Sequence, residues 1–187
     1  NLDYVEEKGI KVVRRMSGGG AVYHDLGNLN FSFHTLLGQN DFGDFSFFTK
    51  PVVNMLNTLG VPAELKGRND LLVDGKKFSG NAKLARHGKM IQHGTILLNS
   101  EMEVLGEALK VNPLKFIDKA TKSNRGRVTN LIDYLPKETT TETLKELLTA
   151  EIIKNNPEAK RYQLSLEDLA GIEQLMEEKY ESWDWNF

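Results

Sequence analysis

The feature that most constrains the fold of this chain is a change in hydrophobic spacing near residue 100. Before that point strand-like patterns dominate; in residues 28–36, for example, apolar side chains occupy every second position, which indicates a half-buried strand. After that point, residues 141–155 and 166–180 carry apolar side chains at the three- and four-residue spacing of amphipathic helices. A strand-rich part followed by a helix-rich part predicts the α+β class.

Turn and capping residues divide the chain further. Residues 74–75 (Asp-Gly) and 87–88 (His-Gly) predict hairpin turns, and Asp-Gly suits the type I′ geometry. Residues 139–142 (Thr-x-x-Glu) and 165–168 (Ser-x-x-Asp) predict capping boxes that open the two C-terminal helices. Extended segments are expected at residues 11–15, 21–24, 63–66, 71–73, 76–79, 81–86 and 89–98, and further helices at residues 2–8, 44–59 and 101–110.

Composition limits the chemistry that the chain can perform. It has no cysteine, which excludes disulfides, cysteine metal ligands and thiol nucleophiles. Its net charge of −2 excludes a polybasic nucleic-acid binder. No apolar run exceeds three residues, so no membrane helix is expected, and the histidine spacing does not suit zinc. A cytoplasmic protein is the default expectation.

The sharpest local motif is residues 14–25, Arg-Arg-Met-Ser-Gly-Gly-Gly-Ala-Val-Tyr-His-Asp. Consecutive glycines let a backbone pass close to a ligand and turn several N–H groups toward an anion. The two arginines add forked donors suited to phosphate or carboxylate. The alternative is a flexible turn with solvated arginines. The motif matches neither a Walker A loop nor the Rossmann fingerprint.

Three further segments could contribute to a site. Residues 67–70 (Gly-Arg-Asn-Asp) precede residues 76–82 (Lys-Lys-Phe-Ser-Gly-Asn-Ala), where a lysine can hold a point charge over a phosphate, although most lysines simply face solvent. His93, beside a glycine, either lines a pocket or is a core histidine. Residues 118–127 carry four cations and few apolar residues, which fits a lid over an anionic ligand or a solvated connector.

Taken in order, these motifs resemble the lipoate–protein ligases, within the wider biotin and lipoyl ligase fold family. The resemblance spans essentially the whole chain and rests on residues 14–28, 67–70, 77–82, 93–99, 127–131 and 182–187. It implies a class II synthetase-like catalytic domain with a mixed, largely antiparallel β-sheet flanked by helices. It also implies that residues 1–187 are this catalytic domain without its first strands and without a C-terminal accessory domain.

The resemblance implies a two-step reaction with ATP, Mg²⁺ and lipoate. The lipoate carboxylate attacks the α-phosphorus of ATP, and a lysine amine of an acceptor then attacks the lipoyl-AMP formed. Expected acceptors are apo lipoyl domains of 2-oxoacid dehydrogenase acyltransferase subunits and the glycine-cleavage H protein; no nucleic-acid or membrane partner is expected. Bringing two anions together requires positive charge and aligned N–H dipoles.

The resemblance also assigns roles to individual residues. Lys77 is the expected catalytic residue, in contact with both lipoate and the α-phosphate. The expected ATP- and adenylate-binding residues are Arg15, Gly20, Ala21, Val22, Tyr23, Asn69, Asp70, Lys77, Lys119 and Arg125. The expected lipoate-binding residues are Lys77, Gly19, His93 and Ala82. Asp70 is also the expected Mg²⁺ ligand, and residues 118–127 correspond to the adenylate-covering loop.

Two alternative functions stay open at this point. One is an ATP-independent lipoyl or octanoyl transferase on the same fold, and the other is a lipoate-binding module without catalysis. The basic segment and Arg15 favour a nucleotide and so argue against the first. The presence of both Lys77 and Arg15 argues against the second.

Overall fold

The computed structural model of this protein describes residues 1–38, 43–110 and 128–187. Its centre is an antiparallel sheet of five strands in the order β1-β5-β4-β3-β2. The strands are β1 (Asn28–Leu36), β2 (Ala63–Lys66), β3 (Asp70–Val73), β4 (Lys76–Arg86) and β5 (Lys89–Leu97). The described helices are α1 (Leu2–Glu7), α2 (Ser46–Thr58), α3 (Met102–Ala108), α4 (Thr141–Lys154), α5 (Leu166–Leu175) and α6 (Trp183–Asn186), with a 3₁₀ turn at Leu131–Asp133 and a π turn at Met176–Tyr180. The expected α+β fold is confirmed.

Both hairpin turns form where the sequence predicts them. Asp74 and Gly75 have φ values of 48° and 72°, and His87 and Gly88 have φ values of 50° and 72°. Both central residues of each turn therefore adopt the left-handed conformation that a type I′ turn requires. The two turns set the register of β3 with β4 and of β4 with β5.

Strand β4 is longer than expected and belongs to both hairpins. The sequence predicts separate strands over residues 76–79 and 81–86, but the structure has one strand across both ranges. Gly80 does not interrupt it, because Gly80 keeps its pairing with Asp70 on β3. The sheet is antiparallel throughout; parallel pairing in the described ranges is an isolated bridge between Lys77 and Val128.

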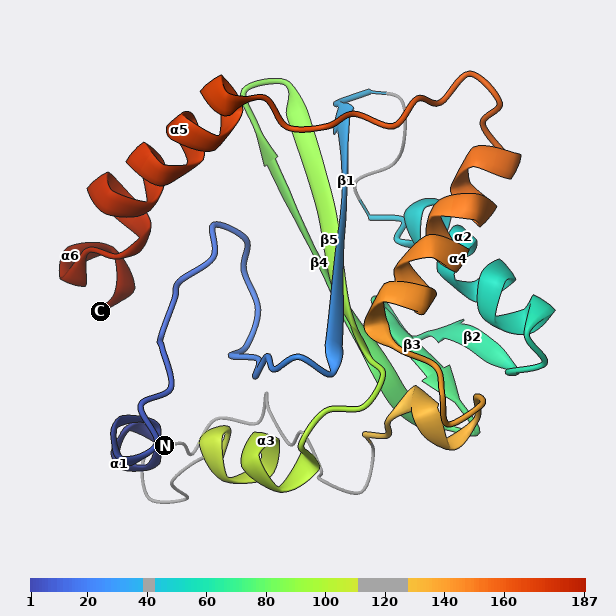
Figure 1. Cartoon of the computed structure of the whole chain (residues 1–187), viewed down its shortest axis with the longest axis horizontal. Coiled ribbons are helices and arrows are strands. Elements are labelled where there is room, and N and C mark those ends of the chain that lie inside the picture. Colours follow the sequence, from blue (N-terminus) through green and yellow to red (C-terminus); the bar gives the residue numbers. More distant parts are fainter. Residues whose placement is uncertain (39–42, 111–127) are drawn as a thin grey trace.

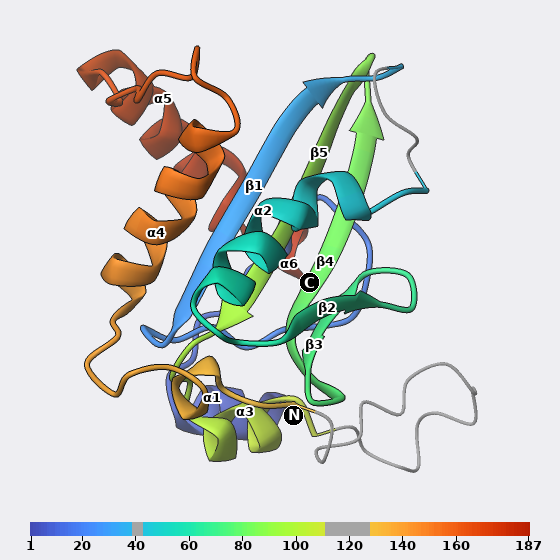
Figure 2. The same cartoon turned by 90° about the vertical axis from the view of Figure 1, so that its right-hand side faces the viewer.

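Helices α2 and α4 cover one face of the sheet, as Figure 1 and Figure 2 both show. Their apolar stripes meet the inward-facing residues of the strands and form the core, because each stripe must be removed from water. The main core residues are Val52, Met55, Leu56, Leu71, Val73, Phe78, Ile96, Leu98, Leu131, Leu144 and Leu148. On the opposite side of the sheet, the part of the chain that the structure describes places the irregular chain of residues 8–27 and helices α5 and α6 (Figure 1).

Two segments that the sequence predicts as extended strands are not strands. Residues 11–15 and 21–24 have no ladder partner among the described residues. Strand-like side chains do not make a strand without a neighbouring backbone to satisfy the N–H and C=O groups. The N–H of Arg14 instead donates to the side chain of Asn186, and the carbonyl of Arg14 accepts from the indole of Trp185.

The two capping predictions have different outcomes. The capping box at Ser165 and Asp168 is confirmed, since each side chain binds the backbone N–H of the other residue. The box at Thr139 is wrong by one residue: Thr140 is the N-cap of α4, and its hydroxyl oxygen accepts from the N–H of Thr143 at 3.1 Å. Three consecutive threonines, residues 139–141, stand where this helix begins, so the pattern alone does not distinguish the capping one.

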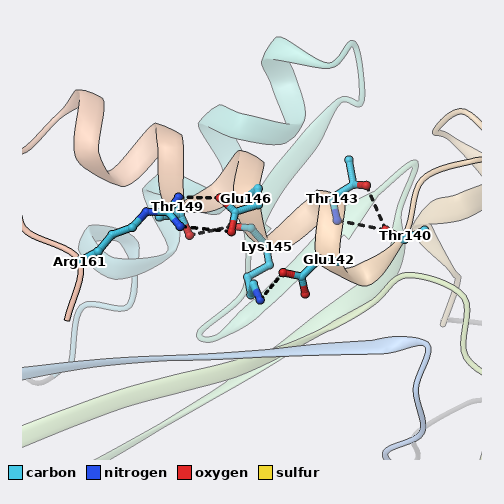
Figure 3. A network of polar contacts seen from close by, with 7 residues as sticks. All are labelled: Thr140, Glu142, Thr143, Lys145, Glu146, Thr149 and Arg161. Atoms are coloured by element: carbon cyan, nitrogen blue, oxygen red, sulfur yellow. Dashed lines mark hydrogen bonds and ion pairs between the residues drawn. The ribbon is translucent and has the colours of Figure 1, made fainter. Parts of the chain in front are cut away.

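The solvent side of α4 carries a chain of polar contacts (Figure 3). Lys145 pairs with Glu142 at 2.5 Å, and Arg161, from the segment that follows α4, pairs with Glu146 at 2.5 Å. Hydrogen bonding to Arg161 holds the pKa of Glu146 below its ordinary value. No helix within the described ranges is long and apolar enough to cross a membrane.

Candidate functional site

A β-bulge decides where the side chain of Lys77 points. In a regular strand, residues 77 and 80 would face opposite sides of the sheet. The register shifts beside Phe78, so that Lys77 pairs with Leu72 while Ser79 pairs with Leu71. Phe78 and Ser79 are consequently both buried, and Lys77 emerges on the uncovered face.

The uncovered face brings together several predicted site residues. The ammonium of Lys77 lies over Gly80, where an added Cβ would stand 3.0 Å from the Lys77 Nζ. Ala82 occupies the next position along this face of β4, and its partner across the ladder is His93 on β5. Gly80 has no side chain and Ala82 has only a methyl group, so the surface of β4 between Lys77 and His93 carries no bulky side chain. We refer to the surface formed by Asp70, Lys77, Gly80, Ala82 and His93 as the open face.

Lys77 and Asp70 form an ion pair on the open face. The Lys77 Nζ lies 2.7 Å from the Asp70 Oδ1, and their side chains are 40% and 38% exposed. A half-exposed ammonium can exchange its partner for a ligand phosphate or carboxylate. Asp70 offers one carboxylate, and the described residues contain no group of three or more acidic or histidine side chains that could hold a metal. A single carboxylate such as that of Asp70 is a suitable ligand for Mg²⁺, which is bound through one or two carboxylates together with substrate phosphates.

The glycine-rich segment is organised by Arg15. Its guanidinium donates to the hydroxyl of Ser17 at 3.2 Å and to the carbonyls of Gly18 and Gly20 at 3.0 and 2.9 Å. Gly19, between those two carbonyls, has a φ of +113°, a value that side-chain-bearing residues rarely adopt. Arg15 occupies the carbonyls of Gly18 and Gly20, and in the part of the chain that the structure describes no hydrogen bond uses the N–H groups of residues 18–23. Unpaired N–H groups next to glycines are the donors that an anion-binding nest requires.

Ser17 attaches this segment to the open face. Its hydroxyl oxygen lies 2.5 Å from the Nε2 of His93, and the Ser17 residue is only 9% exposed. Partial burial, and then the positive charge of Arg15 and the neighbouring His24, lower the pKa of His93 below its ordinary value. Partial burial and Arg15 also lower the pKa of His24. Both rings are therefore neutral at neutral pH.

Two further anchors lie on either side of the glycines. Arg14 donates from its side chain to the carbonyls of Trp185 and Asn186, in addition to its backbone bonds with these residues. Asp25 accepts from the N–H of Gly27 with one carboxylate oxygen and from the N–H of Glu101 with the other, each at 2.8 Å. The segment has no regular secondary structure, yet it is fixed at residues 14, 17 and 25.

The remaining predicted residues are less clearly part of this arrangement. The Asn69 amide donates to the carbonyl of Asn81, so it contacts the middle of β4. Ala21, Val22 and Tyr23 follow the glycines in the irregular chain, and Val22 is 53% exposed. Partial burial, with the carboxylates of Asp25 and Glu101, raises the pKa of Tyr23. Lys119, Arg125 and the expected lid over residues 118–127 lie outside the described residues.

The sequence reasoning gave no individual anchoring role to three residues that hold the site together: Ser17, Arg14 and Asp25. The spacing Asp25-x-Gly27 is typical of an Asx turn and could have identified Asp25. Residues 182–187 were part of the family resemblance, but nothing local to either segment connects Trp185 to Arg14. Ser17 and His93 are 76 positions apart, and no short-range pattern joins them.

Comparison with known proteins shows the family to which the chain belongs. The family model described as "Lipoyl protein ligase A/B catalytic domain" matches residues 1–153. The chain is 48% identical over 189 residues to the lipoate-protein ligase LplJ of Bacillus subtilis (strain 168), covering all of this chain and 57% of that protein. It therefore spans little more than half the length of that curated relative.

Solved structures agree over the whole chain. One, described as a bi-partite lipoate protein ligase and its E2 lipoyl domain from Thermoplasma acidophilum, has a TM-score of 0.84 at 32% identity, covering all of this chain and 74% of that one. A second, a lipoate-protein ligase A bound with ATP, has a TM-score of 0.78 at 28% identity, covering all of this chain and 75% of that one.

Proposed function

The chain belongs to the lipoyl protein ligase A/B catalytic domain family, and on that premise we propose that it is the catalytic part of an ATP-dependent lipoate–protein ligase. The observation that carries the proposal is that Lys77 and the glycine-rich segment lie on the same face of the sheet. The bulge at Phe78 directs Lys77 to the open face, and Ser17 attaches the segment to His93 on that same face. A cation and a row of unpaired N–H groups are thus available to two anions at once.

The first step joins lipoate to AMP. A lipoate carboxylate oxygen attacks the α-phosphorus of ATP, the bond from that phosphorus to the bridging oxygen breaks, and pyrophosphate leaves. Lys77 neutralises part of the charge on the carboxylate and the α-phosphate, which otherwise repel each other. The N–H groups of residues 18–23 donate to phosphate oxygens as negative charge accumulates on them.

Asp70 would hold Mg²⁺ when the metal is present. The ion would neutralise the departing pyrophosphate, which is the chemistry that Mg²⁺ supplies in phosphoryl and nucleotidyl transfer. The short contact between Asp70 and Lys77 would give the carboxylate a second role, because it would hold the ammonium in place for the α-phosphate. Tyr23, Val22 and Ala21 would line the nucleotide, and Ala82 and His93 the lipoyl chain.

The second step transfers the lipoyl group to a lysine of an acceptor. The amine nitrogen attacks the carbonyl carbon of lipoyl-AMP, AMP leaves with the bonding electrons, and the nitrogen loses a proton. The relative from T. acidophilum is described together with an E2 lipoyl domain, which supports apo lipoyl domains as acceptors. We extend the proposal to the glycine-cleavage H protein and to a cytoplasmic location.

A decisive test incubates the chain with ATP, Mg²⁺, lipoate and an apo lipoyl domain. The expected results are release of pyrophosphate and an increase in acceptor mass that corresponds to one lipoyl group. Labelling without ATP, from a lipoylated or octanoylated carrier protein, would support the transferase alternative. Heat of lipoate binding in a calorimeter with neither pyrophosphate release nor labelling would support the non-catalytic alternative.

A further inference from the structure

The contact between Ser17 and His93 forms a directed chain of hydrogen bonds. Arg15 Nε carries a hydrogen and no lone pair, so it donates to the Ser17 oxygen at 3.2 Å. That leaves the Ser17 hydrogen free to be donated onward. Because His93 is neutral at neutral pH, its Nε2 can accept this hydrogen across the 2.5 Å contact. The order is then Arg15 to Ser17 to His93.

This chain is the short connection between the glycine-rich segment and the sheet. Ser17 is the residue immediately before the three glycines, and His93 is directly opposite Ala82 on the open face. The other anchors lie on either side of the glycines: Arg14 attaches to the C-terminal helix, while the His24 ring contacts Asn30 on β1 and Asp25 binds Asn28 and Glu101. Losing the Ser17 contact would therefore release the end of the glycine-rich segment beside His93, and the unpaired N–H groups of residues 18–23 would lose the anchor that directly precedes them.

We propose that Ser17 and His93 are positioning residues for the activation step, and that their hydrogen bond holds the main-chain donors of residues 18–23 over the face that carries Lys77. The proposal rests on the proposed function for its effect on rate, but the contact itself can be tested without any substrate. Neither residue has to touch the reacting atoms, because each acts through the placement of the glycine-rich segment.

The arrangement has a built-in dependence on pH. When His93 takes up a proton, Nε2 becomes a donor and the Ser17 hydrogen must turn away. The resulting cation then faces Arg15 and His24 from the glycine-rich segment, and His34 lies nearby through Ser32, the residue opposite His93 on β1. Ala82, opposite on β4, carries no charge. The contact is therefore intact above the ordinary histidine pKa and is lost as the pH falls through the lowered pKa of His93.

The substrate-free test follows the His93 ring by ¹⁵N NMR during a pH titration of the whole chain. In Ser17→Ala the pKa of His93 should rise, because the hydroxyl that donates to the neutral ring is gone. Ser17→Thr keeps a hydroxyl and should leave the pKa unchanged. Equal titration in the wild type and in Ser17→Ala would overturn the proposal, whatever the protein catalyses.

The rate test measures pyrophosphate release from ATP and lipoate between pH 5 and pH 8. Ser17→Ala should lose about ten- to a hundredfold in rate at pH 7.5, the scale of a 1 Å displacement, and Ser17→Thr should recover most of it. His93→Gln keeps an acceptor that does not titrate, so it should remove the loss of rate that we expect of the wild type as the pH falls through the lowered pKa of His93. The control His34→Gln, on the same face, should keep that decline.

The outcomes separate the two proposals. If the wild type releases no pyrophosphate, the proposed function is refuted. The NMR titration would then still show whether Ser17 donates to His93. An active wild type with an equally active Ser17→Ala, or an unchanged acid decline in His93→Gln, would refute the positioning roles alone. Circular dichroism spectra of each variant identify any loss that is due to unfolding.

Discussion

The two faces of the sheet are built from the same strands but do different work. On the covered face, Leu71, Phe78 and Ile96 have no exposed surface and pack under α2 and α4. On the open face, Asp70 and Lys77 are partly exposed and are separated from His93 by Gly80 and Ala82. The contrast is sharpest on β4, where neighbouring residues 77 and 78 belong to opposite faces. One face thus supplies the stability of the fold and the other supplies its charged groups.

The largest expected effect follows from removing the charge on the open face. Lys77→Ala should lower the rate of pyrophosphate release by at least about a hundredfold, the scale of losing one donor that stabilises developing charge. The thermal midpoint should stay near the wild-type value, because this side chain is half exposed. The matched control is Lys76→Ala, an adjacent exposed lysine that should keep its activity. Near-normal rates of pyrophosphate release in Lys77→Ala would contradict the assignment of the reactive charge to the open face.

The next effect tests the covered face one residue away. Phe78→Ala should lower the free energy of unfolding by about 3–5 kcal/mol, because it leaves a cavity in the core. Urea denaturation measures this loss, and activity should decline only in proportion to the folded fraction. An unchanged denaturation midpoint would show that the two faces do not divide the work as described.

A third effect concerns the conformation of the glycine-rich segment. Gly19→Ala should lower the affinity for ATP. Its φ of +113° disfavours alanine by about 1–2 kcal/mol of conformational free energy, and a Cβ there would stand 2.8 Å from the Arg15 guanidinium. Gly18→Ala meets no atom within 4 Å, so its loss of ATP affinity should be smaller. Calorimetric titration with ATP compares the two; equal losses would contradict a specific role for the Gly19 conformation.

The smallest effect is expected away from both faces. Arg161→Ala removes the contact with Glu146 on the solvent side of α4 (Figure 3). Both side chains are largely exposed, at 63% and 48%, and exposed ion pairs of this kind contribute little to stability. Thermal unfolding and pyrophosphate release should both match the wild type. A clear fall in the thermal midpoint would mean that the ion pair stabilises the fold, and a fall in pyrophosphate release alone would mean that this helix surface takes part in the function.

The sequence predicts best what short-range spacing determines. The type I′ turns at residues 74–75 and 87–88, the amphipathic helices and the half-buried strand β1 all depend on residues within one or two turns of each other. The predicted strands at residues 11–15 and 21–24 are wrong for the opposite reason, since a strand needs a partner from elsewhere in the chain. The single long strand β4 was missed because glycine usually interrupts a strand.

The site was only partly accessible from the sequence. The motifs identified Lys77, Asp70, Ala82 and His93, which the fold brings to one face. The bulge that turns Lys77 outward depends on pairing with β3, and lysine followed by phenylalanine does not by itself predict it. Ser17 was part of a motif, but its partner could be found only once β5 was placed beside the glycine-rich segment.

The bonds from Arg14 to Trp185 and Asn186 join positions 171 and 172 residues apart. A contact of that sequence separation forms late, because nearly the whole intervening chain must be ordered before the two ends meet. The local hairpins can form early and independently of it. The stretch that carries Arg15 and the glycines should therefore be among the last to assemble and among the first to open in hydrogen exchange. A bound nucleotide would then slow amide exchange at both ends of the chain together.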